Sequence, residues 1–443
     1  MATAREVAML TLTACEKQGA WSDGHLKQML REQKLDSRDA ALATRLCFGV
    51  LQNRMLLDWH LASFCNSPLN KLDLKVLCTL RIAAYQLLFL DKIPASAAVN
   101  EAVNMTKKHC RNPRAAGMVN GILRAMLRKE TLPAPKGKDL QETLSVQYSH
   151  PRWLVEKFVS TLGSDGAEAL LAADNAQPPI SAQVNTCKAT VEQTNELLAS
   201  EGVQAQPHPW LKDCLLLSET GNLERLQAFQ DGLFYVQDCA ARLAVTAARI
   251  QSGQRVLDCC AAPGGKSFAA AIALENRGEV ISCDIHPHKI KLLEAGCERL
   301  GLSVIHPMLQ SASERREEWV NGFDTVITDV PCSGLGIIRK KPDIRYKDPE
   351  PLKGLPAIQG KILDNCSAYV KPGGTLIYAT CTLLRRENED VVLAFMNEHP
   401  EYSLEPLGLP VAGGDQAMLT FWPHVHNTDG FFVAKLRKKE ETP

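Results

Sequence analysis

The sequence predicts a multidomain protein in which an all-helical amino-terminal domain precedes an α/β domain built on a parallel sheet. Before about residue 130, apolar residues recur at the three- and four-residue spacing of helices that bury one face. After Gln251, strand-like apolar runs alternate with helical segments, which is typical of a parallel sheet covered on both faces. The 443 residues suffice for two to four domains at about 100–200 residues each.

Three stretches of the amino-terminal part place apolar residues on one helical face. They are Leu77, Leu80, Ala84, Leu87 and Leu88; Val99, Ala102, Val103 and Thr106; and Met118, Val119, Ile122, Leu123 and Met126. The stretch 133–138, with two prolines and a glycine, is typical of a linker. We therefore expect a helical domain over residues 1–135.

The middle of the chain carries mixed signals. Short helical and strand-like pieces follow one another from Tyr148 to about Gly232, with a break at Pro178 and Pro179. This pattern predicts a small α/β connecting subdomain over residues 145–235.

The regular α/β pattern predicts a third domain over residues 236–440. Its parallel strands are expected at Arg255–Cys259, Glu279–Asp284, Val304–Met308, Asp324–Asp329 and Thr375–Cys381. Two further apolar runs, Leu419–Trp422 and Phe431–Leu436, are separated by a polar turn and predict a closing antiparallel hairpin.

Charge is unevenly distributed although 50 basic and 50 acidic residues cancel over the whole chain. Residues 1–130 carry 19 Lys and Arg against 11 Asp and Glu. Seven of these basic residues lie between Asn100 and Lys129: Lys107, Lys108, Arg111, Arg114, Arg124, Arg128 and Lys129. The cluster fits contact with phosphates and fits a solvated helix face equally well.

The fifteen cysteines are scattered, without a Cys-x-x-Cys pair that would hold zinc, so no metal site is expected. A reducing compartment fits this usage. Because no signal pattern is present and no apolar run approaches the ~18 residues that span a bilayer, we expect a cytoplasmic protein without a membrane partner.

A glycine-rich turn follows the first strand of the third domain, at Ala261-Ala262-Pro263-Gly264-Gly265-Lys266. Such a turn lets backbone approach a ligand closely, because glycine has no side chain. A triphosphate-binding loop would need a glycine where Cys260 stands, and the dinucleotide fingerprint Gly-x-Gly-x-x-Gly is absent. S-adenosylmethionine remains as the expected cofactor, with Asp284 at the next strand end placed to hold its ribose. The alternative for Asp284 is a helix cap.

Two cysteines stand where apolar runs end: Cys332 in Asp329-Val330-Pro331-Cys332, and Cys381 in Ala379-Thr380-Cys381. Most other cysteines read as small core residues. A thiolate at a strand end can attack C6 of a pyrimidine, which makes C5 nucleophilic enough to accept a methyl group. Asp329 could hydrogen-bond the same base.

These motifs resemble the RNA 5-methylcytosine methyltransferases of the NOL1/NOP2/Sun family. The segments that carry the resemblance are Asp258–Lys266, Asp329–Ser333, Lys340–Asp343, Thr380–Thr382 and Glu387-Asn388. The amino-terminal part, for example Val119-Asn120-Gly121-Ile122-Leu123-Arg124, is similar to the NusB-like RNA-binding domain of the RsmB (Sun/Fmu) branch. The resemblance implies a Rossmann-like class I S-adenosylmethionine-dependent methyltransferase domain and 16S (small-subunit) ribosomal RNA as substrate.

The resemblance also implies roles for single residues. Cys381 would be the nucleophile, Cys332 would assist product release, and Asp329 would contact the target base. The residues expected to bind the cofactor are Cys260, Ala261, Ala262, Pro263, Gly264, Gly265, Lys266, Asp284, Gln310 and Asp329. We expect a monomer that takes free or early-assembly RNA, with its protein partners unspecified.

The chain departs from the family pattern in three places, one of which is Val330, where the family has a small residue. Gln310 stands near the place where the family has an acid that contacts adenine, and Arg385-Arg386 replaces a Pro-Glu pair. The two arginines bring positive charge near Cys381, which could lower its pKa or bind RNA phosphate. A binding protein with a decayed catalytic half, a P-loop nucleotide triphosphatase, and transfer RNA as substrate remain as alternatives.

Overall fold

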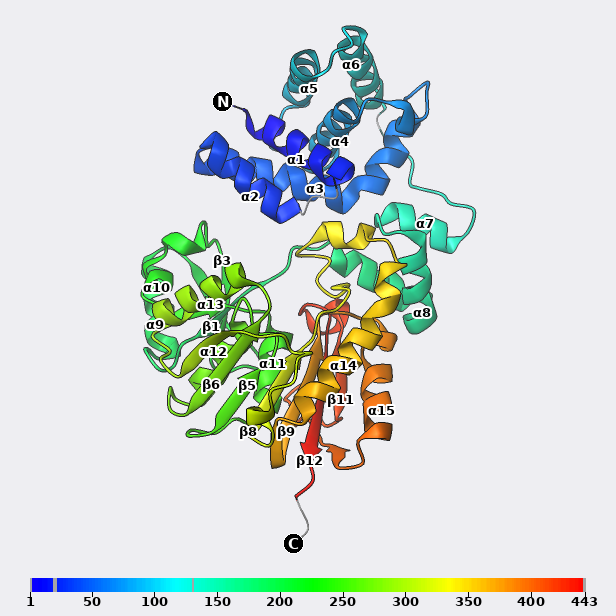
Figure 1. Ribbon diagram of the computed structural model, residues 1–443. Helices are drawn as coiled ribbons and strands as arrows, with labels where there is room; N and C mark the ends of the chain where they lie inside the picture. Colours follow the sequence, from blue (N-terminus) through cyan, green and yellow to red (C-terminus); the bar gives the residue numbers. More distant parts are fainter. Residues whose placement is uncertain (1, 19–21, 130, 441–443) are drawn as a thin grey trace. The chain divides into compact units, whose positions relative to one another are not determined.

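The computed structural model describes residues 2–18, 22–129 and 131–440 (Figure 1). Its contacts divide the chain into two compact units. One comprises Met1–Ala176 with Ile338–Lys347, and the other comprises Gln177–Ile337 with Asp348–Pro443. The chain therefore leaves the second unit after Ile337, contributes ten residues to the first, and returns at Asp348.

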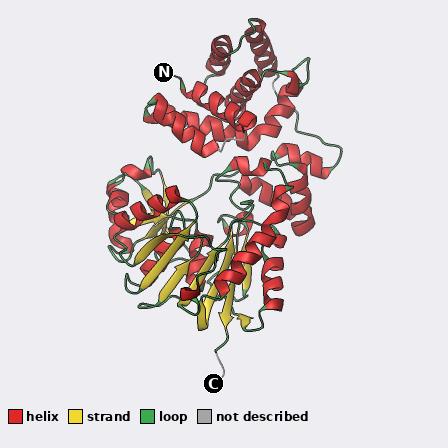
Figure 2. Cartoon of the chain, viewed as in Figure 1, coloured by secondary structure: helices red, strands yellow, loops and turns green. Residues whose placement is uncertain are grey.

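The first unit consists of helices and loops over its described residues, as Figure 2 shows. Its α-helices are α1 (Ala4–Gln18), α2 (Ser22–Gln33), α3 (Ser37–Ala62), α4 (Leu74–Phe89), α5 (Ala95–His109), α6 (Arg114–Leu127), α7 (Leu140–Gln147) and α8 (Arg152–Asp174). Asp36, Asp73 and Asp139 cap α3, α4 and α7 by accepting backbone N–H groups. Helices α7 and α8 belong to this unit, although the sequence places most of them in the connecting subdomain.

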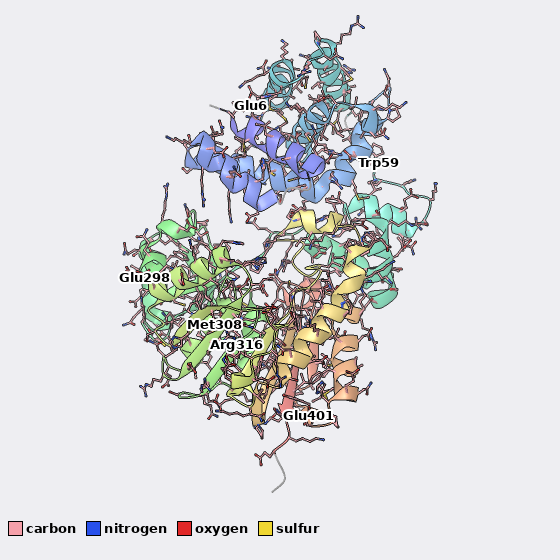
Figure 3. All side chains as sticks on the ribbon, viewed as in Figure 1. Glu6, Trp59, Glu298, Met308, Arg316 and Glu401 are labelled. Atoms are coloured by element: carbon pink, nitrogen blue, oxygen red, sulfur yellow. The ribbon has the colours of Figure 1, made fainter. Side chains whose placement is uncertain are left out.

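Helix α4 forms the centre of the first unit because every residue from Val76 to Gln86 is buried. Ion pairs fasten the helices around it. The carboxylate of Glu6, labelled in Figure 3, meets Lys108 Nζ at 2.7 Å and His109 Nε2 at 2.8 Å, which ties α1 to the end of α5. The helical amino-terminal domain predicted from periodicity is confirmed.

The inserted residues Ile338–Lys347 are anchored in the first unit by the short 3-10 helix η4 (Pro342–Tyr346). The guanidinium of Arg345 is fully buried, and its Nη1 donates to Gln52 O and to Asn175 Oδ1, both at 2.9 Å. The Tyr346 hydroxyl donates to Leu51 O at 2.9 Å. No sequence pattern predicted this insertion.

The second unit begins with a small antiparallel sheet in the order β2-β3-β1-β4. Its strands are β1 (Ile180–Val184), β2 (Gln204–Pro207), β3 (Cys214–Ser218) and β4 (Phe234–Val236), with α9 (Val191–Ser200) and α10 (Gln227–Gln230) between them. All six of these elements lie between Ile180 and Val236.

The main sheet of the second unit has the order β10-β12-β9-β8-β5-β6-β7, with β11 paired to β12. Strands β5 (Arg255–Asp258), β6 (Glu279–Asp284), β7 (Ile305–Leu309), β8 (Phe323–Asp329) and β9 (Val370–Thr380) are parallel. Strands β10 (Tyr402–Leu404), β11 (Met418–Phe421) and β12 (Phe431–Lys438) extend the sheet antiparallel, so the predicted hairpin forms. Because β6 and β8 flank β5 on opposite sides, the strand order reverses there, and ligands bind at the carboxyl ends of the strands beside such a point.

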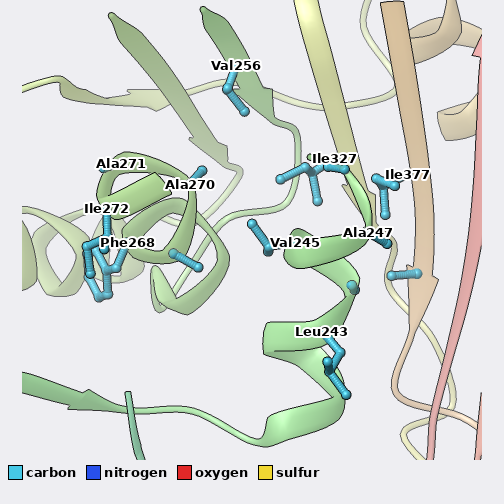
Figure 4. Packing of buried hydrophobic residues seen from close by; sticks show 14 of the residues in the cluster. Leu243, Val245, Ala247, Val256, Phe268, Ala270, Ala271, Ile272, Ile327 and Ile377 are labelled. Carbon is cyan, nitrogen blue, oxygen red and sulfur yellow. The ribbon is translucent and has the colours of Figure 1, made fainter. Parts of the chain in front are cut away.

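Helices cover both faces of this sheet. They are α11 (Cys239–Ala247), α12 (Gly265–Ala273), α13 (Pro287–Leu300), α14 (Leu355–Ser367), α15 (Glu389–Glu398) and the short α16 (Pro423–His426). On one face, Val256, Ile327 and Ile377 pack with Leu243 of α11 and Phe268 of α12 (Figure 4).

The sequence neighbours of these strand residues, Leu257, Val326 and Leu376, belong to a second cluster with Ile362 of α14 and Val392 of α15. Each such fully buried aliphatic side chain contributes about 1.5–3 kcal/mol. Burial on both faces confirms the covered parallel sheet.

Candidate active site

The two cysteines predicted to act together do meet. Strands β8 and β9 are parallel neighbours with Asp329 opposite Ala379, so the loops that follow them leave the sheet side by side. Cys332 Sγ lies 3.2 Å from Cys381 Sγ, and both thiols are partly accessible. Two thiols at this distance can reach one ring of a bound base.

Cys332 holds its proton more tightly than an ordinary thiol. Its pKa lies well above the usual value, first because of the hydrogen bond with Cys381 and second because of burial. Cys332 is therefore the thiol that remains protonated and can donate to the sulfur of Cys381. The arrangement distinguishes the two cysteines chemically.

An ion pair between a buried lysine and a half-buried aspartate lies beside the cysteines. Lys266, in the first turn of α12, places Nζ 2.5 Å from Asp329 Oδ2 at the end of β8. Burial by itself would lower the pKa of Lys266, but the charge of Asp329, followed by Asp258 and Cys381, raises it. The site thus holds a permanent cation in the field of both Asp329 and Cys381.

Glu387 connects the two cysteine loops, a role that sequence reasoning missed. Its buried carboxylate accepts the Ser333 backbone N–H at 2.8 Å and the Gln359 side-chain N–H at 3.0 Å. The Tyr378 hydroxyl donates to the backbone carbonyl of Glu387 at 2.5 Å. Glu387 therefore fixes the loop after Cys332, helix α14 and strand β9 relative to one another.

Asn388 fixes the Cys381 loop through hydrogen bonds of its side chain. Its Oδ1 accepts from Thr380 Oγ1 at 2.6 Å, and its Nδ2 donates to Thr382 O at 3.0 Å. Both neighbours of Cys381 are thereby held. A polar Glu-Asn pair after an apolar strand was the available signal for both residues.

The glycine turn is shaped to bring backbone to a ligand. Gly264 has φ +116°, and a Cβ there would lie 2.5 Å from Leu293 and from Phe268. Two hydrogen bonds to the neighbouring strands fix the turn. The Ala261 N–H donates to Cys283 O at 2.7 Å, and Ser267 Oγ donates to Asp258 Oδ2 at 2.7 Å. Burial raises the pKa of the Asp258 carboxyl to about 6.

Asp284 ends β6 next to this turn, as predicted. Its Oδ1 accepts the His286 N–H at 2.9 Å, and its Oδ2 lies 3.4 Å from Lys289 Nζ. The first contact resembles the capping role considered from the sequence. The long contact at Oδ2 leaves this oxygen able to accept hydrogen bonds from a pair of ribose hydroxyls.

Exposed apolar side chains adjoin Asp284 at two neighbouring strand ends. Ile285 is 58% exposed and Leu309, which pairs with Asp284 across β6 and β7, is 56% exposed. Exposed aliphatic groups beside a buried acid and a glycine turn fit a flat apolar ring joined to a ribose. The residues present therefore fit an adenosyl cofactor, although sequence reasoning had not selected Ile285 or Leu309.

Gln310 follows β7 and uses its side chain within its own loop. Its Oε1 accepts from Arg316 Nε at 2.8 Å, and its Nε2 donates to Ser311 O at 3.1 Å. Arg316 is labelled in Figure 3. Contact between Gln310 and an adenine would therefore require exchange of one of these bonds.

The two arginines after Cys381 have different surroundings. Arg385 is exposed and pairs with Asp390 at 3.0 Å. Arg386 is half-buried and lines a groove beside α14 and α15.

In the first unit, all seven basic residues between Asn100 and Lys129 are exposed.

The part of the chain that the structure describes contains no group of three or more His, Cys, Asp and Glu side chains placed to hold a metal ion. Within the same residues, every helix is too short or too polar to cross a membrane.

Three protein-family profiles match the chain. The family described as 16S rRNA methyltransferase RsmB/F matches residues 245–437, the NusB family matches residues 2–128, and the ferredoxin-like domain of RsmF/B-like methyltransferases matches residues 150–224. The chain is 37% identical over 447 residues to the probable ribosomal RNA small subunit methyltransferase B of Bacillus subtilis (strain 168), which covers 98% of each protein. It is 30% identical over 411 residues to the ribosomal RNA small subunit methyltransferase B of Klebsiella pneumoniae, which covers 92% of each.

Solved structures agree with the fold. The crystal structure of PH0851 is similar with a TM-score of 0.82 at 26% identity, over 99% of both chains. The structure of NSun6 from Pyrococcus horikoshii with SFG is similar with a TM-score of 0.58 at 21% identity, over 66% of this chain and 99% of that one. The predicted Rossmann-like methyltransferase architecture is confirmed.

Proposed function

We propose that this chain, which belongs to the ribosomal RNA small subunit methyltransferase B family, methylates C5 of a cytosine in 16S ribosomal RNA through a covalent bond between a cysteine and C6. Family membership supports methylation of small-subunit ribosomal RNA. The observation that carries the choice of base and chemistry is the pair of thiols, Cys332 and Cys381, 3.2 Å apart beside the ion pair of Lys266 and Asp329. Transfer of a methyl group to nitrogen or oxygen needs no thiol, whereas C5 of cytosine needs activation by a nucleophile.

Cys381 is the nucleophile in this proposal. Its sulfur attacks C6, and the electrons of the C5–C6 double bond move so that C5 can take the methyl group. Asp329 contacts the base and Lys266 keeps Asp329 in place. In the final elimination the C5 proton passes to water, with Cys332 placed to relay it. The C5–C6 double bond re-forms as the bond between C6 and Cys381 breaks, and the electron pair of that bond returns to the Cys381 sulfur as thiolate.

S-adenosylmethionine supplies the electrophilic methyl group. We assign its binding to the turn from Cys260 to Lys266, to Asp284, and to the strand end at Leu309 and Gln310. The backbone of the turn would approach the cofactor closely, and Asp284 would accept from the ribose. We further propose that the protein works in the cytoplasm as a monomer, on free or early-assembly RNA.

The test is transfer of labelled methyl to 16S ribosomal RNA from a strain that lacks the enzyme. Cys381→Ala should abolish product, and Cys332→Ala should accumulate a protein–RNA adduct that survives denaturation. Cys187→Ala, which changes an exposed cysteine, is the matched control. A Cys381→Ala enzyme that retains wild-type activity would overturn the mechanism.

Two rival functions remain distinguishable in the same experiment. If the protein binds the cofactor and methylates transfer RNA but not 16S RNA, transfer RNA is the substrate. Absence of cofactor binding would favour the decayed enzyme, and binding of nucleotide triphosphates instead would favour the triphosphatase.

A further inference from the structure

We propose that the groove between α14 and α15 binds a backbone phosphate of the RNA strand that carries the target base, through Arg386 and Lys361. The inference rests on the proposed function and adds a substrate contact to it. The groove encloses about 680 Å³ and is lined by both helices and by the loop that contains Arg315.

The two cations are available to an anion. Among the residues that the structure describes, Lys361 and Arg386 have neither an ion pair nor a side-chain hydrogen bond. The Nε atom of Arg386 is buried without an acceptor. Phosphate is one of the anions whose oxygens match the guanidinium fork, and it is the anion that RNA carries.

Two of the three acidic residues that line the groove have partners elsewhere. Asp390 pairs with Arg385 at 3.0 Å, and Asp364 lies 3.3 Å from His399 Nε2. The third, Glu398, is exposed and is one carboxylate against the two cations. Arg315, the third cation of the groove, lies 3.4 Å from Glu317. Lys361 and Arg386 therefore remain as the cations to attract a phosphate.

Both walls of the groove are coupled to the cysteine loops. Arg386 lies five residues after Cys381 and directly before Glu387, whose carboxylate accepts from Ser333 and Gln359. On the other wall, Gln359 Nε2 donates to Pro331 O at 3.0 Å, next to Cys332. A phosphate held by Arg386 would thus belong to the strand that enters the active site, close to the base that Cys381 attacks.

The decisive experiment compares Arg386→Ala, Arg386→Gln and Lys361→Ala with Lys353→Ala, an exposed lysine that pairs with Glu350 at 2.7 Å outside the groove. Steady-state methyl transfer gives kcat and the KM values for 16S RNA and for S-adenosylmethionine. Filter binding of the same RNA without cofactor gives its Kd at several salt concentrations. Circular dichroism confirms that each variant is folded.

We expect the KM and Kd for RNA to rise about three- to tenfold in each groove variant, with the slope of log Kd against log salt reduced by about 0.7–0.9 for each lost phosphate contact. The KM for S-adenosylmethionine should stay unchanged, and Lys353→Ala should behave as wild type. Wild-type RNA affinity and salt slope in both Arg386 variants would overturn the inference while methyl transfer leaves the proposed function intact. If wild type transfers no methyl group, the proposed function fails. The Kd and the salt slope of the variants then decide by themselves whether the groove binds an RNA phosphate.

Discussion

Cys332 Sγ and Cys381 Sγ lie 3.2 Å apart although 49 residues separate them in the chain. Parallel pairing of β8 with β9 produces this contact, because it brings the two strand ends to one edge of the sheet. The hydrogen bond between the thiols is also the first cause of the high pKa of Cys332. The position of Cys381 therefore influences the pKa of Cys332.

The first prediction concerns this coupling. In wild type, Cys332 should react with iodoacetamide only at alkaline pH. The thiolate is the reactive form, and at any pH below its raised pKa Cys332 is mostly protonated. Cys381→Ala removes the largest cause of the shift, so the pH at which Cys332 reacts should fall. Peptide mapping by mass spectrometry against pH measures this midpoint, and an unchanged midpoint would contradict the coupling. Cys187 in the same sample serves as an internal reference.

A second prediction separates cofactor binding from RNA binding. Asp284→Ala should weaken S-adenosylmethionine binding at least tenfold, since hydrogen bonds to a charged group contribute about 1.5–3 kcal/mol. Ile285→Asn should weaken it less, through lost apolar contact. Isothermal titration with the cofactor, alongside filter binding of RNA, checks both variants. Equal loss of RNA affinity would instead indicate that the whole edge of the sheet is disturbed.

Much of the second unit could be predicted from the sequence. Strand β6 was predicted at its observed bounds, Glu279–Asp284. Of the predicted catalytic residues, Asp329 ends β8, Cys381 directly follows β9, and Cys332 lies in the loop three residues after β8. The reason is that buried parallel strands are continuous apolar runs, and the residue after such a run lies at the ligand-binding edge.

Other features depend on partners far away in the chain, which no local signal reveals. Glu387 acts through hydrogen bonds to Ser333 and Gln359, 54 and 28 residues away, and a polar residue in a loop has no periodicity to reveal such partners. The passage of Ile338–Lys347 into the first unit depends in the same way on buried carbonyl groups elsewhere in the chain. The exposed residues Ile285 and Leu309 became candidates only when their lack of burial was known.

Glu387 provides the third prediction. Glu387→Ala should lower kcat at least tenfold while the KM for S-adenosylmethionine changes less than twofold, because Ser333 and the Cys332 loop lose their common acceptor. Glu387→Gln keeps one acceptor oxygen and should restore part of kcat. Single-turnover methyl transfer measures the difference. If the glutamine variant is as inactive as the alanine variant, the charge rather than the hydrogen-bond geometry is what the site requires.

The last prediction concerns the anchor of the inserted segment. Arg345 Nη1 donates to Gln52 O and Asn175 Oδ1, so Arg345→Ala leaves several buried acceptors without a donor. We expect the first unit to lose about 2–5 kcal/mol of stability. Urea unfolding followed by tryptophan fluorescence, with Trp59 on α3 as a reporter in this unit, measures the loss. Lys129→Ala, an exposed change in the same unit, should be neutral within about 0.5 kcal/mol. If Arg345→Ala unfolds at the same urea concentration as Lys129→Ala, the buried guanidinium contributes nothing to the unit, and the segment must be held by Tyr346 and its apolar neighbours.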